Sequence, residues 1–110
     1  MTSSAQVMAV CAALGDETRW QILERLGRGD HSASALAEML PLTRQAIAKH
    51  LAALQAVGLV ESYRAGRELR FRALGAQLSA TARALEEIGA AWDRRLAAIK
   101  TVAESLSEQD

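Results

Sequence analysis

Apolar residues recur along this chain with two spacings, helical toward both ends and strand-like in between. A spacing of three and four residues predicts four helices before residue 58, over about 5–14, 17–28, 33–39 and 44–57. Alternation with a period of two follows over 59–64 and 67–73, which predicts two strands joined by a turn at Ala65-Gly66. The helical spacing then returns and predicts one long helix over about 76–107.

Residues that commonly begin and end helices mark the boundaries between these elements. Asp16, Ser32 and Thr43 precede the second, third and fourth helices, where each side-chain oxygen can accept a backbone N–H of the first turn. Gly58 follows the fourth helix, where a glycine in the left-handed conformation commonly ends a helix. Because the connections are this short, we expect a single domain over residues 1–110.

The middle of the chain contains a predicted core. Its helices carry their apolar residues on one side, at Ile22, Leu23, Leu26, Leu36, Ala37, Leu40, Ile47, Leu51 and Leu54, and the second strand does so at Leu69, Phe71 and Ala73. Two short helices joined by a tight turn and followed by a solvated two-stranded hairpin form a winged helix-turn-helix. The expected fold is mainly α with a two-stranded β wing; the helix-turn-helix lies at about 33–57 and the wing at about 59–73.

Charge is unevenly distributed, although 13 basic and 13 acidic residues give the 110-residue chain a net charge of zero. Residues 41–72 contain six basic and two acidic side chains, whereas acidic residues outnumber basic ones by two in each flanking segment. A basic middle between acidic flanks is the pattern expected when one face of a protein meets phosphates.

The predicted fourth helix presents the candidate DNA-reading surface. Residues 44–57 contain no Asp or Glu, whereas solvated helices usually mix both signs of charge. Arg44 can hydrogen-bond guanine and Gln45 adenine in the major groove, while Thr43 and Lys49 suit phosphates. We therefore predict that this helix enters the major groove of duplex DNA.

Three further positions of this helix bear on the prediction. Ala48 and Ala52 are small enough to allow a close approach to the groove. We expect His50 to pack within the helix-turn-helix, with its imidazole on a backbone group or a phosphate.

The predicted hairpin supplies a second basic surface. Arg64 and Arg67 flank Gly66 at its tip, and we expect these three residues to contact DNA. Arg70 and Arg72 lie nearer the body of the domain. Their charge is compatible with either a DNA contact or the solubility of an edge strand.

Three segments of the chain read ALGDETRWQILERL, SASALAEMLPLTRQAIAKHLAALQAVGLV and SYRAGRELRFRAL. They resemble the ArsR-type (ArsR/SmtB) family of winged-helix transcriptional repressors. The run from Arg44 to Leu51, followed by Leu54 and Gly58-Leu59-Val60, is more specific than a generic helix-turn-helix. Family members commonly have serine where this chain has Ala48, so one contact to DNA is expected to be missing.

The resemblance implies a homodimer formed by the first and last helices and a palindromic operator. A homodimer of this kind would cover two apolar surfaces. One is the nearly all-apolar helix at 5–14. The other is the seven-residue repeat of the last helix, which is too long for so small a domain to cover alone and consists of Leu78, Leu85, Trp92, Ile99 and Leu106. We therefore place the dimer interface at Val7, Val10, Leu85, Ile88, Trp92, Leu96 and Ile99.

The resemblance also allows metal sensing, but the ligands that it implies are missing. Metal-sensing members carry a cysteine pair in the third helix, where this chain has Ser32 and Ser34, or His and acidic ligands in the last helix, which here has no histidine. His31, His50 and Cys11 are scattered over three predicted elements. We expect no metal and no cofactor, Cys11 as a small buried apolar residue, and Trp20 and Trp92 as packing residues.

Three classes of function remain to be weighed. The leading hypothesis is a cytoplasmic DNA-binding repressor that either responds to an unidentified organic effector or simply autoregulates. The second is a dimeric protein-interaction module that has kept the fold without binding DNA. An enzyme is disfavoured, because the sequence shows no acid–base pair, phosphate loop or nucleophile–base spacing. Apolar runs are too short to cross a bilayer, and one cysteine fits a reducing compartment.

Overall fold

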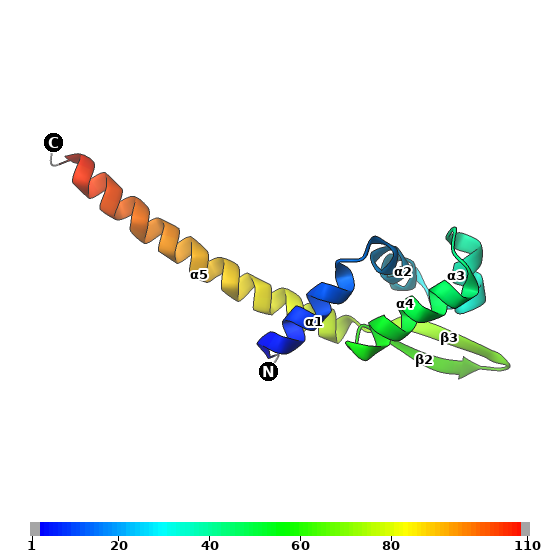
Figure 1. Ribbon diagram of the computed structural model, residues 1–110. Helices are drawn as coiled ribbons and strands as arrows, with labels where there is room; N and C mark the ends of the chain where they lie inside the picture. Colours follow the sequence, from blue (N-terminus) through cyan, green and yellow to red (C-terminus); the bar gives the residue numbers. More distant parts are fainter. Residues whose placement is uncertain (1–2, 109–110) are drawn as a thin grey trace.

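The computed structural model describes residues 3–108, which form five helices and a small sheet, arranged as in Figure 1. The helices are α1 (Ser4–Leu14), α2 (Glu17–Arg28), α3 (Ala33–Met39), α4 (Arg44–Ala56) and α5 (Gly75–Glu108), and the strands are β1 (His31–Ser32), β2 (Val60–Ala65) and β3 (Glu68–Ala73). Every predicted helix and both predicted strands are present, with bounds that differ by at most one residue. The winged helix-turn-helix fold is confirmed.

The predicted caps begin the helices as expected. The side chains of Asp16, Ser32 and Thr43 each accept the backbone N–H of the residue three positions further on, at 3.0, 3.1 and 3.1 Å. Each bond satisfies one of the N–H groups that have no partner within the helix. Gly58 has a φ of 77°, which is the left-handed conformation that ends α4.

The core lies where α2, α3 and α4 meet the inner face of the sheet. Its buried residues include Ile22, Leu26, Leu36, Leu40, Ile47, Leu51, Leu54, Leu59 and Phe71. Leu23 and Ala37 pack against this cluster from its edge. The core therefore holds α4 by its apolar side and leaves its other side facing outward.

The predicted two-stranded wing is confirmed, and the sheet also has a short third strand that the sequence analysis did not predict, in the order β1-β3-β2. β1 pairs antiparallel with β3, with His31 opposite Phe71. The turn of the hairpin is also one residue later than predicted, because β2 extends to Ala65 and the two turn residues are Gly66 and Arg67. Gly66 has a φ of 65° and Arg67 does not have a positive φ, which is the pattern of a type II′ turn.

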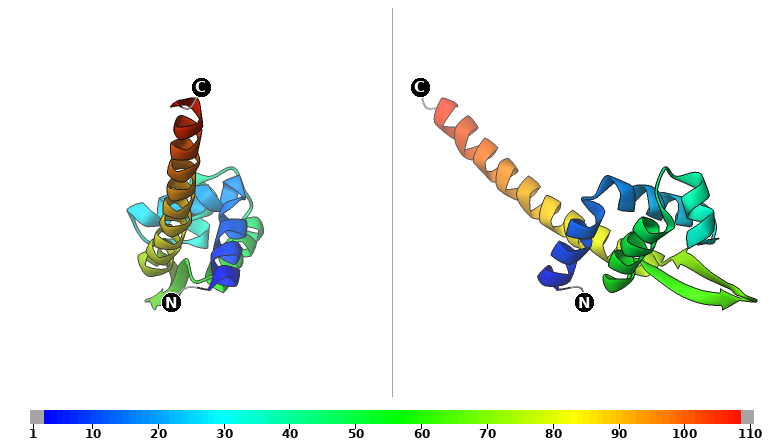
Figure 2. Two further views of the ribbon diagram at one scale, coloured as in Figure 1. Left: turned by 90° about the vertical axis from the view of Figure 1, so that its left-hand side faces the viewer. Right: turned by 45° about the vertical axis from the view of Figure 1, so that its right-hand side comes forward.

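The helix α5 projects away from the rest of the molecule, at the end opposite the wing (Figures 1 and 2). Its 34 residues correspond to about 50 Å at 1.5 Å per residue, and they give the chain an extent of 75 Å along its longest axis. α1 packs beside the first turns of α5, and beyond α1 no other element of residues 3–108 runs alongside α5.

α1 corrects two predictions, because its sides are not equivalent. Val10 is fully buried in the protomer's own core, so its assignment to a dimer interface was wrong. Cys11 is exposed rather than buried. Met8, with 70% of its surface exposed, marks the outward side of this helix.

Candidate nucleic-acid interface

The outward side of α4 is a continuous exposed surface. Thr43, Arg44, Gln45, Ala48, Lys49 and Ala52 are all exposed, as the sequence predicted. The apolar residues Ile47, Leu51 and Leu54 are buried on the opposite side of the helix. The side chains of this surface are therefore accessible to a ligand with a groove wide enough to admit a helix, such as duplex DNA.

The charged groups of this surface are not neutralised within the chain. Among residues 3–108, Arg44 and Lys49 have no acidic group within 4 Å. The Thr43 hydroxyl accepts the Ala46 N–H at 3.1 Å, which leaves its own hydrogen free to donate. The surface therefore offers two cations, one hydroxyl and one amide without a competing carboxylate.

His50 points toward α2 rather than outward. Its Nδ1 accepts a hydrogen bond from Nε of Arg19 at 3.3 Å, and the side chain is half-buried. Its Nδ1 is therefore bonded to a side chain rather than to the backbone group expected, and the phosphate contact stays a prediction. The same neighbourhood includes Asp16, whose pKa lies below its usual value because the backbone N–H of Arg19 donates to the carboxylate.

The four arginines of the wing divide into two pairs. Arg64 and Arg67 are exposed beside the turn, and within the described part of the chain neither has a hydrogen-bond or ion-pair partner for its guanidinium. Arg70 and Arg72 instead pair with Glu68 and Glu61, at 3.3 and 2.6 Å. Arg70 and Arg72 are therefore paired on the strand surface of the protomer, unlike Arg64 and Arg67.

A tyrosine that the sequence analysis missed anchors the outer face of the wing. The Tyr63 hydroxyl donates to Oδ2 of Asp30 at 2.6 Å, and the Arg72 guanidinium lies 4.5 Å from the centre of the Tyr63 ring. The bond to Asp30 raises the pKa of Tyr63. Tyr63 thus ties β2 to the turn before β1. Because these residues are 33 positions apart, no local pattern could have indicated the contact.

Known proteins share both the sequence and this arrangement. Residues 14–63 match a family described as a helix-turn-helix domain. YuzN, an HTH-type transcriptional regulator of Bacillus subtilis, is 43% identical over 68 residues, and the match covers 54% of this chain and 72% of YuzN. The structure of an ArsR-like transcriptional regulator from Rhodococcus is 69% identical and covers 90% of this chain and 93% of its own, with a TM-score of 0.85. The chain belongs to the ArsR family.

A further relative, described as a possible ArsR-family transcriptional regulator, concerns assembly. The homodimeric winged helix-turn-helix DNA-binding domain from Mycobacterium bovis is 30% identical and covers 81% of this chain and 80% of its own, with a TM-score of 0.63. Together these similarities confirm the predicted class, a DNA-binding transcriptional regulator.

The end of this ArsR-family regulator opposite the wing is apolar. Along α5, Leu85, Ile88, Trp92, Leu96 and Ile99 are between 47% and 63% exposed. A hollow of about 530 Å³ lies between α1 and α5, and it is lined by Val7, Met8, Ala84, Ile88 and their neighbours. Trp92 and Trp20 (51% exposed) are not packing residues within a single chain.

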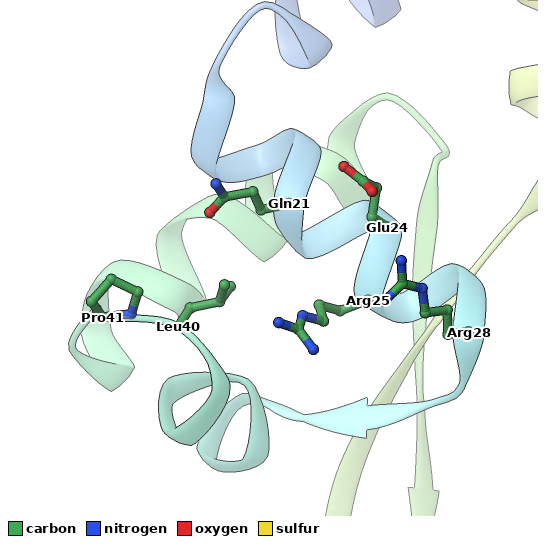
Figure 3. Close-up of a pocket in the computed structure, with 6 residues that line it drawn as sticks. All are labelled: Gln21, Glu24, Arg25, Arg28, Leu40 and Pro41. Atoms are coloured by element: carbon green, nitrogen blue, oxygen red, sulfur yellow. The ribbon is translucent and has the colours of Figure 1, made fainter.

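A polar hollow of about 370 Å³ between α2 and Leu40-Pro41 is lined by Gln21, Glu24, Arg25 and Arg28, and Figure 3 shows Arg25 pointing from α2 into it. These residues provide one carboxylate beside two guanidinium groups, which is no metal-ligand set. Within residues 3–108, no three His, Cys, Asp or Glu side chains are grouped closely enough to hold a metal ion. No helix in this same part of the chain is both long and apolar enough to cross a bilayer.

Proposed function

We propose that this ArsR-family regulator binds a palindromic operator as a homodimer in the cytoplasm and represses transcription from it. The observation that carries the proposal is the outward side of α4, which is exposed, basic and free of acidic residues. A helix of this size fits the major groove, and a hairpin beside it can follow the adjacent backbone or minor groove.

Within this proposal the exposed residues have different roles. Arg44 and Gln45 lie on the first turn of α4 and are proposed to read base edges, while Thr43 and Lys49 contact phosphates. Arg64 and Arg67, at the tip of the wing, are proposed to contact DNA because their charge is not neutralised within the protomer.

The proposed dimer is supported by the exposed stripe of α5. A soluble chain rarely presents so many large apolar side chains along one helix unless a partner covers them. Val7 and Met8 of α1 border the same stripe, so a second copy would bury both helices together. In a two-fold dimer the two α4 helices would read half-sites about one helical turn of DNA apart, which is why a palindrome is expected.

The proposal excludes the family's usual metal sites and any enzymatic reaction. Ser32 and Ser34 stand where the resemblance would require cysteines, and the Ser32 hydroxyl is occupied by the Ala35 N–H. An effector of this protein would then be an organic molecule at the interface between protomers, and without one the protein would regulate only by its own concentration.

The proposal is tested by binding to duplex DNA from upstream of the protein's own gene. We expect retardation of this duplex, competed poorly by a scrambled duplex of the same composition. The variant Arg44→Glu/Lys49→Glu should lose binding. The matched control Arg83→Glu/Arg94→Glu, which makes the same charge change on exposed positions of α5 opposite Trp92, should keep it. A dimer that binds no DNA would instead identify a protein-interaction module.

A further inference from the structure

A groove separates the reading surface of α4 from the wing. It has a volume of about 370 Å³ and is lined by the start of α3 at Ser34, by Arg44 and Ala48 of α4, and by Arg67 and Leu69 of the wing. A bond from the Gln55 side chain to Ser62, at 3.3 Å, connects α4 to the same face of β2 further along. The groove therefore lies directly between the two surfaces assigned to DNA.

The position of the groove determines which part of a duplex could enter it. The major and minor grooves of DNA are separated by one sugar–phosphate strand. If α4 occupies the major groove and the wing follows the adjacent groove, that strand must pass between them. The groove is the space that the structure leaves for this strand.

The polar groups of the groove suit an anion. Arg44 and Arg67 lie on opposite walls, and both are unpaired within the described residues. The Glu68 carboxylate also borders the groove, but it accepts hydrogen bonds from Arg70 at 3.3 and 3.4 Å, which neutralise it. Ser34 is exposed and, unlike Ser32, its hydroxyl is not used as a helix cap, so it can donate to an oxygen of a ligand.

The apolar side of the groove suits a deoxyribose. Leu69 lies on the same strand face as Phe71, yet 42% of its surface is exposed, because the core does not extend this far toward the tip of the wing. Its partner across the hairpin is Arg64. A leucine between arginines can be covered by the sugar that adjoins a bound phosphate, which is the apolar part of the DNA backbone.

We propose that this groove binds one phosphodiester of the operator backbone, an assignment that rests on the proposed function. Ser34 donates to a phosphate oxygen, Arg67 neutralises the phosphate and Leu69 packs on the adjoining deoxyribose. Arg44 adds charge from the opposite wall and remains free to reach a base. Ser34 and Leu69 thus join the DNA-binding residues as contacts that act on every sequence alike.

The proposal is tested with charge at residue 34. Ser34→Asp places a carboxylate against the phosphate, while an acidic residue in the first turn of α3 is favourable for the helix, so folding is retained. We expect about a hundredfold loss of affinity for the upstream duplex, since a like-charge contact at an interface is strongly unfavourable. Ser34→Ala should lose about tenfold and Ser34→Thr should bind like the wild type. The control Ser79→Asp, on an exposed part of α5, should also bind like the wild type.

Ethylation of single phosphates locates the contact. We expect one phosphate per half-site whose ethylation weakens the wild-type protein but no longer weakens Ser34→Ala, while the other interfering phosphates are unchanged. An unaltered interference pattern, or full affinity of Ser34→Asp, overturns the proposal although the protein still binds DNA. Binding of inorganic phosphate alone, with the interference pattern unaltered, would identify a small-anion site and overturns it as well. A wild-type protein that binds no DNA contradicts the proposed function itself.

Discussion

The two ends of the molecule both present exposed helix surfaces, but their chemistry is opposite. The outward side of α4 carries cations and amides, whereas the outward side of α5 carries leucine, isoleucine and tryptophan. Water stabilises the first surface and disfavours the second. The residue types that are missing from an exposed helix face therefore indicate what that face binds. The outward side of α4 has no acidic residue, and the α5 stripe has no polar residue at its repeating positions.

The largest expected effect comes from introducing a charged residue into the apolar stripe of α5. Trp92→Lys should give monomers, because an ammonium group would have to be buried against a second apolar helix. Affinity for a palindromic duplex should then fall by more than about a hundredfold, since the two half-sites are no longer bound together. Sedimentation velocity measures the first effect and a binding titration the second.

A matched control separates the interface from the helix. Ala90→Lys adds the same charge two residues away on the opposite side of α5, and it should remain a dimer. An intact Trp92→Lys dimer would place the interface elsewhere on the protein.

The affinity for DNA should fall as the salt concentration rises, because the outward side of α4 and the tip of the wing are basic. If each protomer contacts about three phosphates, the logarithm of the association constant should fall with the logarithm of salt concentration with a slope of about −5. Arg67→Ala removes one contact per protomer and should reduce the magnitude of this slope by about 2. Arg72→Ala should leave the slope unchanged, because its guanidinium is paired with Glu61. A slope near zero for the wild type would contradict a phosphate interface.

Substitutions of the residues proposed to contact bases should have different effects from substitutions of those proposed to contact phosphates. Arg44→Ala and Gln45→Ala should each relax preference at one position of the half-site by about 1–3 kcal/mol, because a bidentate contact to a base is lost. Arg67→Ala should weaken all sequences equally. The measurement is affinity for a set of duplexes with single base-pair changes. Equal effects of the three variants would show that α4 does not read bases.

The smallest expected effect concerns the cap of α2. The pKa of Asp16 is lowered in the folded protein by the Arg19 N–H, so the cap stabilises the fold above the usual carboxyl pKa of 3.8 and is lost as pH falls through the lowered value. Asp16→Asn keeps an uncharged cap and should lose less of its melting temperature between pH 7 and pH 3. Thermal unfolding followed by circular dichroism checks this, and equal losses in both proteins would exclude the cap as the cause.

Short-range features of this protein could be predicted from its sequence. The caps at Asp16, Ser32 and Thr43 act over three residues, and the buried stripe of α4 repeats every three or four, so each is visible in a short window. The exposed side of α4 could be predicted from the same repeat, since its residues occupy the remaining positions of the helix.

Long-range features could not be predicted. β1 has only two residues and pairs with β3 40 positions later, too short for any alternation to show. α1 is nearly all-apolar, so no pattern indicated that Val10 faces the core while Met8 and Cys11 face outward. The groove at Ser34 and Leu69 is built from three elements that meet only in the folded chain.

The connection between the wing and α5 has a mechanical consequence. β3 ends at Ala73 and α5 begins at Gly75, and the single residue between them is tied to Leu59 by a backbone hydrogen bond of 2.8 Å. So short a connection, held by this bond, limits how far the hairpin and α5 can turn relative to each other. In a dimer, a change in the angle between the two α5 helices would therefore change the distance between the two hairpins. The hairpins would then no longer match the fixed pitch of a DNA duplex.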